Sequence, residues 1–311
     1  MAERNIRNVT FSNLAWDTSA DIYFPPGFDE GGKYPTIVAA HPIGSCKEQT
    51  SGTIYGAALA DAGFLVIAFD ASFQGASGGT PRFIENPYFR VADISYAIDY
   101  LVTLPYVDEQ RIGAIGICGG GGYSINAAMT ERRIKAVGSV TGVNFGRLCR
   151  EGFSGYDPVG ALQAMAAQRT AEIRGAQARV DNYLPTTRAA AEQRGITDID
   201  MLEAIDYYKT PRGQKPHGAT SALFSRNSAA MGWDAFAHAE VLLTQPLMVV
   251  IGDRPGGFGA YRDGCEIHGR AASKQKELVI AEGCSHYDLY DRPEPVALAL
   301  SRLVPFYREN L

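Results

Sequence analysis

Long apolar segments, paired cysteines and an excess of positive charge are all missing from this 311-residue sequence. No run of about 18 apolar residues is present, so we expect no transmembrane helix. Residues 1–9 contain Glu3, Arg4 and Arg7 and lack the apolar stretch of a secretory signal. The five cysteines form no CxxC pair, which indicates free thiols in a reducing compartment and argues against a structural zinc site. We therefore expect a cytoplasmic protein.

The charge and composition narrow the class of protein further. A net charge of −5 offers no basic patch for a phosphate backbone, so we do not expect nucleic acid as a partner. Hydrophobic residues make up 46% of the chain, which is ordinary for a globular protein and gives no sign of disorder.

Short apolar runs alternate with helical patterns along most of the chain. Runs that are apolar at almost every position are typical of strands buried on both faces of a parallel sheet. The expected strands of this kind are residues 35–41, 64–70, 111–118, 134–140, 246–253 and 277–281. The expected helices are residues 51–62, 91–104, 259–274 and 293–308. A pair of antiparallel strands over residues 9–25 precedes this pattern, which predicts an α/β fold with a mostly parallel central sheet flanked by helices.

The segment 144–238 differs from the rest because it is rich in alanine, helical in pattern and free of any clear strand. We interpret it as a helical lid inserted into one core, which consists of residues 1–143 and 239–311. Ligands of open α/β sheets bind at the carboxyl ends of the strands, so such an insert would cover the site. The alternative is that the insert only enlarges the core.

The strongest local motif is Gly116-Ile-Cys118-Gly-Gly120, at a predicted turn from strand to helix. The residue at so abrupt a turn is strained, its side chain points out of the sheet edge, and the positions two before and two after must be small. Gly116 and Gly120 meet that requirement, and Cys118 stands where serine is usual. We expect the helix N-terminus to lower the pKa of Cys118, which makes it the candidate nucleophile.

Two other interpretations apply to this turn. A phosphate-binding loop is disfavoured because neither GxGxxG nor GxxxxGK[ST] occurs and no acidic residue ends the following strand. A buried, unreactive cysteine stays open, since that is the more common situation of a lone cysteine.

His286, in Glu282-Gly-Cys-Ser-His-Tyr-Asp288, is the candidate base. It directly follows the last predicted strand, where this kind of architecture places the base. Imidazole suits proton transfer because its free pKa is about 6.5. The other four histidines lack this position, and a histidine in a surface loop is the alternative interpretation.

The orienting acid should follow the strand 246–253, and Asp253 is the candidate for it. The usual place lies slightly further along, where this chain has Arg254-Pro-Gly-Gly-Phe258, so Asp263 and Glu266 remain alternatives.

The oxyanion hole needs two N–H donors. One is expected from Gly119, and the other from Ile43 or Gly44, because Pro42 has no N–H. An ordinary tight turn would also account for Pro42 and Gly44.

Several motifs together resemble the dienelactone-hydrolase-related branch of the α/β-hydrolases, which includes bacterial hydrolases and fungal polyketide transferases or thiohydrolases. The motifs are Gly116-Ile-Cys-Gly-Gly120, His41-Pro42, Lys47-Glu-Gln49, Phe69-Asp-Ala-Ser-Phe-Gln-Gly-Ala-Ser77 and His286-Tyr-Asp-Leu-Tyr-Asp291. The resemblance runs from Asn8 to the end of the chain. It implies the α/β-hydrolase fold, Cys118 as nucleophile, His286 as base, and Ile43 and Gly119 as oxyanion donors. The region of Asp253 departs from the family pattern.

The sequence thus predicts a hydrolase that cleaves an ester, lactone or thioester through an acyl-Cys118 intermediate. An acyltransferase using the same first step, and a repurposed scaffold that binds or cyclises a metabolite, are the alternatives. We expect a small-molecule acyl substrate, no cofactor, no metal and no membrane partner, and leave a homodimer open. Aromatic and apolar residues of the insert are candidates for the pocket wall, although core packing would also explain them: Phe153, Tyr156, Tyr207, Tyr208, Phe224, Met231, Trp233 and Phe236. Arg212 is a weaker candidate for binding a carboxylate.

Overall fold

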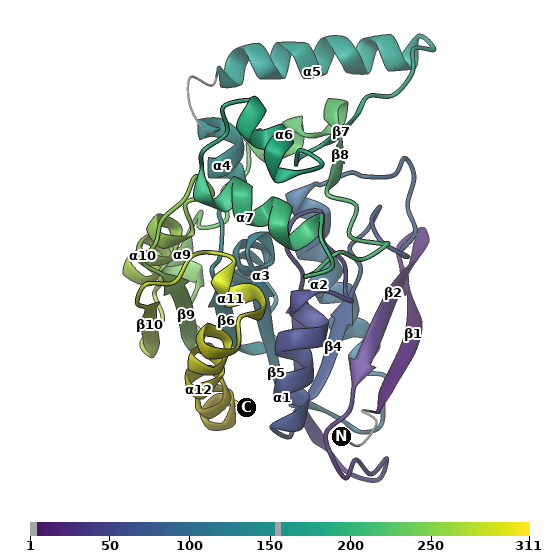
Figure 1. Cartoon of the computed structure of the whole chain (residues 1–311). Coiled ribbons are helices and arrows are strands. Elements are labelled where there is room, and N and C mark those ends of the chain that lie inside the picture. Colours follow the sequence, from purple (N-terminus) through teal and green to yellow (C-terminus); the bar gives the residue numbers. More distant parts are fainter. Residues whose placement is uncertain (1–4, 153–156) are drawn as a thin grey trace.

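The computed structural model describes residues 5–152 and 157–311 and shows a twisted sheet between two layers of helices (Figure 1). Within these ranges, eight strands form the sheet in the order β1-β2-β4-β3-β5-β6-β9-β10. β1 pairs antiparallel with β2, and β2 antiparallel with β4, whereas the other neighbours are parallel. The predicted fold class and the N-terminal antiparallel pair are therefore confirmed.

The strands follow the predicted apolar runs closely. They are β1 (Ile6–Asn13), β2 (Trp16–Tyr23), β3 (Tyr34–Ala40), β4 (Leu65–Phe69), β5 (Val107–Ile117), β6 (Ile134–Val140), β9 (Leu247–Gly252) and β10 (Lys276–Ala281). Successive side chains of a strand point to opposite faces. Ile37 and Ile115 therefore join one buried cluster, and Val38 and Ala114 join the other. This double burial is why these strands lack the alternation of an exposed sheet.

Helices cover both faces of the sheet (Figure 1). The core helices are α1 (Ala57–Asp61), which continues a π-helical segment (Thr50–Gly56), and α2 (Pro87–Leu101), α3 (Gly119–Thr130), α9 (Ala239–Leu242), α10 (Ala260–Arg270), α11 (Asp288–Asp291) and α12 (Pro293–Asn310). α1 and α12 pack on one face, and α2, α3 and α10 pack on the other. α2 begins earlier than predicted because Asn86 caps it by accepting from Tyr88 N–H, with Pro87 at the first helical position.

The segment between β6 and β9 contains most of the remaining elements, and much of it lies above the sheet in Figure 1. They are α4 (Phe145–Glu151), α5 (Pro158–Ile173), β7 (Val180–Asn182), α6 (Arg188–Gln193), α7 (Ile199–Tyr208), β8 (Ser221–Leu223), a 3₁₀ turn (Phe224–Arg226) and α8 (Ser228–Met231). β7 and β8 pair antiparallel, so the insert contains two short strands besides the expected helices. Strands this short show no alternation in sequence. The insert boundaries at residues 144 and 238 stay a prediction.

Two further observations complete the fold. No helix within residues 5–152 and 157–311 combines the length and the apolar character needed to cross a bilayer. Phe153 and Tyr156, two of the aromatic residues predicted for the pocket wall, lie outside the described residues.

Candidate active site

Cys118 occupies the abrupt turn between β5 and α3. Its backbone has φ 56° and ψ −125°, in the left-handed half of conformational space that a non-glycine residue seldom adopts. The turn is closed tightly, because a Cβ added to Gly116 would lie 2.0 Å from the backbone oxygen of Gly120. The structure therefore has the strained strand-turn-helix geometry that the glycine spacing predicts.

The sulfur of Cys118 lies at the wall of an apolar cavity of about 180 Å³. The cavity lies where the insert meets the core, at the carboxyl end of β5. The residues that line it are Ile43, Cys118, Phe145, Leu148, Tyr183, Leu184, Met201, Tyr208, Thr220, Phe258, Tyr287 and Tyr290. No Lys, Arg, Asp or Glu side chain is among these lining residues. The cavity therefore suits a neutral, largely apolar group.

Of the pocket residues predicted from the insert, Tyr208 lines this cavity. Tyr207 instead packs into an aromatic cluster with Tyr208 and Tyr290. Trp233 and Phe236 lie in the hydrophobic core, where Trp233 packs on Tyr123. Phe224 and Met231 are likewise outside the lining. The aromatic residues that do line the cavity are Phe145, Tyr183, Tyr208, Phe258, Tyr287 and Tyr290, and the insert adds Leu148, Leu184 and Met201 to the wall.

Backbone N–H groups face the Cys118 sulfur at the expected places. The N–H groups of Gly119 and Ile43 hydrogen-bond to it and, together with the Tyr290 hydroxyl, favour the thiolate. Burial is the larger effect, and it raises the pKa of Cys118 to about 11. The expectation of a lowered pKa is thus corrected: in the free protein the thiol stays protonated at neutral pH. The two predicted oxyanion donors do converge on this point.

His286, in the loop after β10, is connected with the same thiol through the hydroxyl of Tyr290. Its Nε2 lies 3.3 Å from the Tyr290 hydroxyl oxygen, and the same hydroxyl hydrogen-bonds to Cys118. Its Nδ1 lies 2.8 Å from Oγ1 of Thr141, which follows β6. Burial lowers the pKa of His286 to about 3, so the imidazole is neutral at physiological pH. A neutral imidazole can accept the proton of Cys118, with Tyr290 between the two.

Replacing Tyr290 with phenylalanine should slow the alkylation of Cys118 by iodoacetamide at pH 8 by about 100-fold, the lower end of the range for loss of a positioned proton-transfer group. The hydroxyl is the bridge between thiol and imidazole, while the ring packs among Tyr207, Tyr208 and Tyr287 and is retained. Labelling is quantified at Cys118 by peptide mass spectrometry. Tyr207→Phe is the matched control, because Tyr207 shares the cluster but does not line the cavity. Equal rates in both variants would contradict a bridging role.

The three carboxylates proposed as orienting acid are placed away from the imidazole. Asp253 is exposed and accepts from the Gly283 N–H at 2.6 Å. Asp263 is buried but forms an ion pair with Arg147 at 2.7 Å, and Glu266 pairs with Arg270 on α10 at 2.9 Å. Among the hydrogen bonds of the described residues, the partners of the His286 ring are Thr141 and Tyr290. The structure therefore does not bring Asp253 together with Cys118 and His286.

Sequence reasoning missed the residues that hold the oxyanion loop, which is the segment 41–47 after β3 that contains Ile43. Gln49 accepts from Ser45 Oγ at 2.6 Å and donates to Gly213 O of the insert at 2.6 Å. Asp70, after β4, accepts from Lys47 N–H at 2.8 Å. In the sequence, Lys47-Glu-Gln49 and Phe69-Asp70 indicated only the resemblance to the family and predicted no structural role. Their physical role is to fix Ile43 and its neighbours between core and insert.

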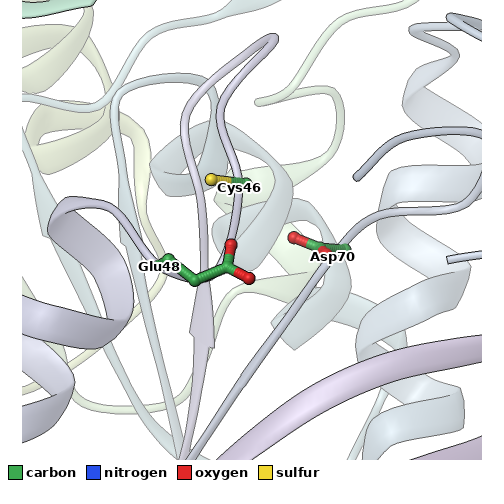
Figure 2. A group of neighbouring side chains, drawn as sticks. All are labelled: Cys46, Glu48 and Asp70. Atoms are coloured by element: carbon green, nitrogen blue, oxygen red, sulfur yellow. The ribbon is translucent and has the colours of Figure 1, made fainter. Parts of the chain in front are cut away.

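Cys46, Glu48 and Asp70 form the one group of Cys, His, Asp and Glu side chains in the described residues that is close enough to share a metal ion (Figure 2). The Lys47 ammonium already lies 2.5 Å from Glu48, and backbone N–H groups of Lys47 and Ala76 satisfy Asp70. Burial and the adjacent Glu48 raise the pKa of the Cys46 thiol. A protonated thiol and an internal cation fit a loop anchor better than a metal site.

Arg212 also has its charge paired and its N–H groups bonded within the protein. Its guanidinium pairs with Asp291 at 2.6 Å and donates to the Tyr287 carbonyl at 2.8 Å. It therefore ties the insert to the loop that carries His286, and the carboxylate it contacts belongs to this chain.

The chain is similar to several known proteins. The family model of the dienelactone hydrolase family matches residues 25–147, which include Ile43 and Cys118. The uncharacterized protein YcjY of Escherichia coli (strain K12) is 42% identical over 100% of both chains. The crystal structure of hypothetical protein PA2218 from Pseudomonas aeruginosa is 30% identical, covers 100% of this chain and 95% of its own, and superposes with a TM-score of 0.88. Thiohydrolase aneE of Aspergillus aculeatus is 23% identical over 70% of this chain and 68% of its own. The chain belongs to the dienelactone hydrolase family and is an enzyme with the α/β-hydrolase fold.

Proposed function

We propose that this enzyme cleaves an ester, lactone or thioester of a neutral, largely apolar acyl group through an acyl-Cys118 intermediate. The observation that carries the proposal is the convergence of three groups on one sulfur, one of which connects it with an imidazole. Cys118 is held at the strained turn, the N–H groups of Ile43 and Gly119 point at it, and Tyr290 connects it with His286.

The proposed first half-reaction starts from a neutral thiol and a neutral imidazole. As Sγ of Cys118 attacks the acyl carbon, its proton passes by way of the Tyr290 hydroxyl to Nε2 of His286. The carbonyl oxygen gains negative charge and is stabilised by the N–H groups of Ile43 and Gly119. The bond from the acyl carbon to the leaving oxygen or sulfur then breaks, and the leaving group takes the proton from His286. This leaves a thioester on Cys118 and neutral imidazole.

In the second half-reaction, water attacks the thioester carbon while His286 accepts a proton from it. The carbon–sulfur bond breaks, the carboxylic acid leaves, and Cys118 regains its proton. The raised pKa of the thiol fits this sequence, because deprotonation is then coupled to attack and a free thiolate is not required.

Acyl transfer is the second candidate, and the apolar lining of the cavity favours it. An acyl-enzyme shielded from bulk water would survive until an alcohol or amine acceptor enters. The relatives include proteins named thiohydrolase and one named acyltransferase drtE, of Aspergillus calidoustus, which is 24% identical over 43% of this chain.

Product analysis separates the two functions. The enzyme is incubated with N-acetylcysteamine thioesters of increasing acyl length, with and without a small alcohol at millimolar concentration. Hydrolysis predicts free acid as the main product under both conditions, whereas transfer predicts that the alcohol diverts most product to ester. Release of neither product from any thioester, oxygen ester or lactone tested would contradict both candidates.

A further inference from the structure

Asp200 is a buried carboxylate of the insert that the scheme above does not use. It lies on α7 with 1% of its surface exposed. Its Oδ2 accepts from the Phe258 N–H at 2.9 Å, while its Oδ1 is buried without a hydrogen-bond partner. An unpaired buried carboxylate oxygen is costly, so proteins seldom retain one without a reason.

Asp200 lines the same small cavity as His286. Thr141, Asp200 and His286 all line a cavity of about 10 Å³, together with Gly252, Arg254 and Gly256. That volume is about the space of a single water molecule. A connection of one water, or a small side-chain movement, would link the free Oδ1 of Asp200 to the Thr141 hydroxyl.

The loop after β9 is shaped around this carboxylate. That loop is where an α/β-hydrolase would carry its orienting acid, and here it contains Gly256. A Cβ added to Gly256 would lie 2.3 Å from Cγ of Asp200. The carboxylate of the insert therefore takes up the space into which a side chain at position 256 would project.

Thr141 gives the carboxylate a path to the imidazole. A hydroxyl donates one proton and accepts others. If His286 donates its Nδ1–H to Oγ1 of Thr141, the Thr141 proton is free to point toward Asp200. The same tautomer leaves Nε2 unprotonated, so it can accept from Tyr290 and act as the base.

We infer that Asp200 is the acid of this active site, a positioning residue that acts through Thr141 to fix the tautomer of His286 and to stabilise its protonated form. The insert then supplies a functional group of the catalytic machinery as well as the wall of the cavity. The inference rests on the proposed role of His286 as base.

The charge of Asp200 gives the inference a pH signature. Burial raises the pKa of Asp200 to about 7, and the nearby Asp198 and Glu203 add to the rise, while the Phe258 N–H opposes it. The other titratable or charged groups around it are His286, Tyr287, Cys118, Arg254 and Tyr261. Ionised Asp200 stabilises imidazolium and the protonated acid does not. The reactivity of Cys118 should therefore increase as pH rises through about 7.

The test measures iodoacetamide labelling of Cys118 from pH 5 to 9 in the full-length protein, quantified on the Cys118 peptide. The thiolate fraction of Cys118 grows with pH across this range in every variant, because burial raises its pKa to about 11. Wild type should show, above this common increase, an additional rise centred near pH 7. Asp200→Asn should lose this rise and react at least 10-fold more slowly at pH 8. Asp198→Asn is the matched control, because Asp198 also binds the loop after β9, through Gly257 N–H at 2.7 Å, yet does not line the cavity. Its rate at pH 8 should stay within twofold of wild type and the rise should persist, with its midpoint moved to lower pH because the charge of Asp198 no longer raises the pKa of Asp200.

A second pair of variants keeps the test decisive if Asp200→Asn does not fold. Thr141→Val removes the hydroxyl and should abolish the rise near pH 7, whereas Thr141→Ser retains the hydroxyl and should keep it. A rise of unchanged size and midpoint in Asp200→Asn or in Thr141→Val overturns the inference. Alkylation of Cys118 needs no acyl substrate, so this assay tests the role of Asp200 alone. Failure of the proposed function would appear in a different assay, as the absence of product from thioesters and esters.

Discussion

Replacing Cys118 with alanine should lower kcat for any thioester or ester substrate by at least about 10⁴-fold, the scale seen when a covalent nucleophile is removed. The physical reason is that the sulfur of Cys118 is the atom to which the N–H groups of Ile43 and Gly119 and the Tyr290 hydroxyl hydrogen-bond. The residual rate would come from binding and the oxyanion donors alone. Turnover is measured under substrate saturation, so that loss of kcat is separated from loss of binding.

The fold should survive this change, which is what makes the result interpretable. The Cys118 side chain faces the cavity, and alanine adopts the same strained backbone no less easily than cysteine. Thermal unfolding should therefore change by only a few degrees. Cys46→Ala is the matched control, because Cys46 is also a buried thiol near the oxyanion loop but faces Glu48 and Asp70 (Figure 2). Retained turnover in Cys118→Ala would remove the proposed mechanism.

Replacing Gly116 with alanine should destabilise the protein by at least about 3 kcal/mol, the upper range for forcing extra volume into a packed site. The new Cβ would lie 2.0 Å from Gly120 O and 2.2 Å from Gly120 C. Both are backbone atoms of the first turn of α3, so relief requires the helix to move away from β5. That movement would also displace Cys118 and the N–H of Gly119, and activity should fall together with stability.

Gly269→Ala is the control for the effect that a glycine-to-alanine substitution has on the unfolding free energy when no clash is present. Gly269 is exposed near the end of α10, and nothing lies within 4 Å of the position of an added Cβ. Alanine there should stabilise the protein by about 0.5–1 kcal/mol, because it restricts the unfolded chain and favours the helix. Chemical denaturation of both variants measures the difference. Similar unfolding free energies for the two would contradict the tight-turn account.

Much of the fold was predictable because buried parallel strands leave a local mark in sequence. The apolar runs that became β3, β4, β6 and β9 need no knowledge of distant contacts to be recognised. The elbow at Cys118 was predictable for a similar reason, since its glycines lie two residues away on either side. β7 and β8 were missed because three residues are too few to show a period.

The acid of the site shows where local reasoning stops. Asp253 follows a strand at nearly the expected place, but its side chain turns to the Gly283 N–H at the surface. Asp200 lies in a different element, and nothing near it in the sequence indicates that α7 reaches the loop after β9. The sequence showed only that the usual place of the acid, slightly past Asp253, contains Arg254-Pro-Gly-Gly-Phe258 and no carboxylate.

The pKa of Cys118 was the other point that sequence could not give. The helix N-terminus and the N–H donors do favour the thiolate, as expected, but the burial that the insert and the aromatic cluster impose outweighs them. The dipole of the helix N-terminus, which can be inferred from sequence, lowers the pKa of Cys118. The loss of surrounding water, which depends on the folded structure, raises it by more.

Intact-mass spectrometry of the enzyme, quenched in acid within milliseconds of mixing with a slowly hydrolysed thioester, tests the central claim most directly. The account predicts one added acyl group per chain, located by peptide mapping on Cys118 and lost in Cys118→Ala. Product formation with the acyl group on another residue, or with no acylated enzyme even when hydrolysis is slowed, would contradict it.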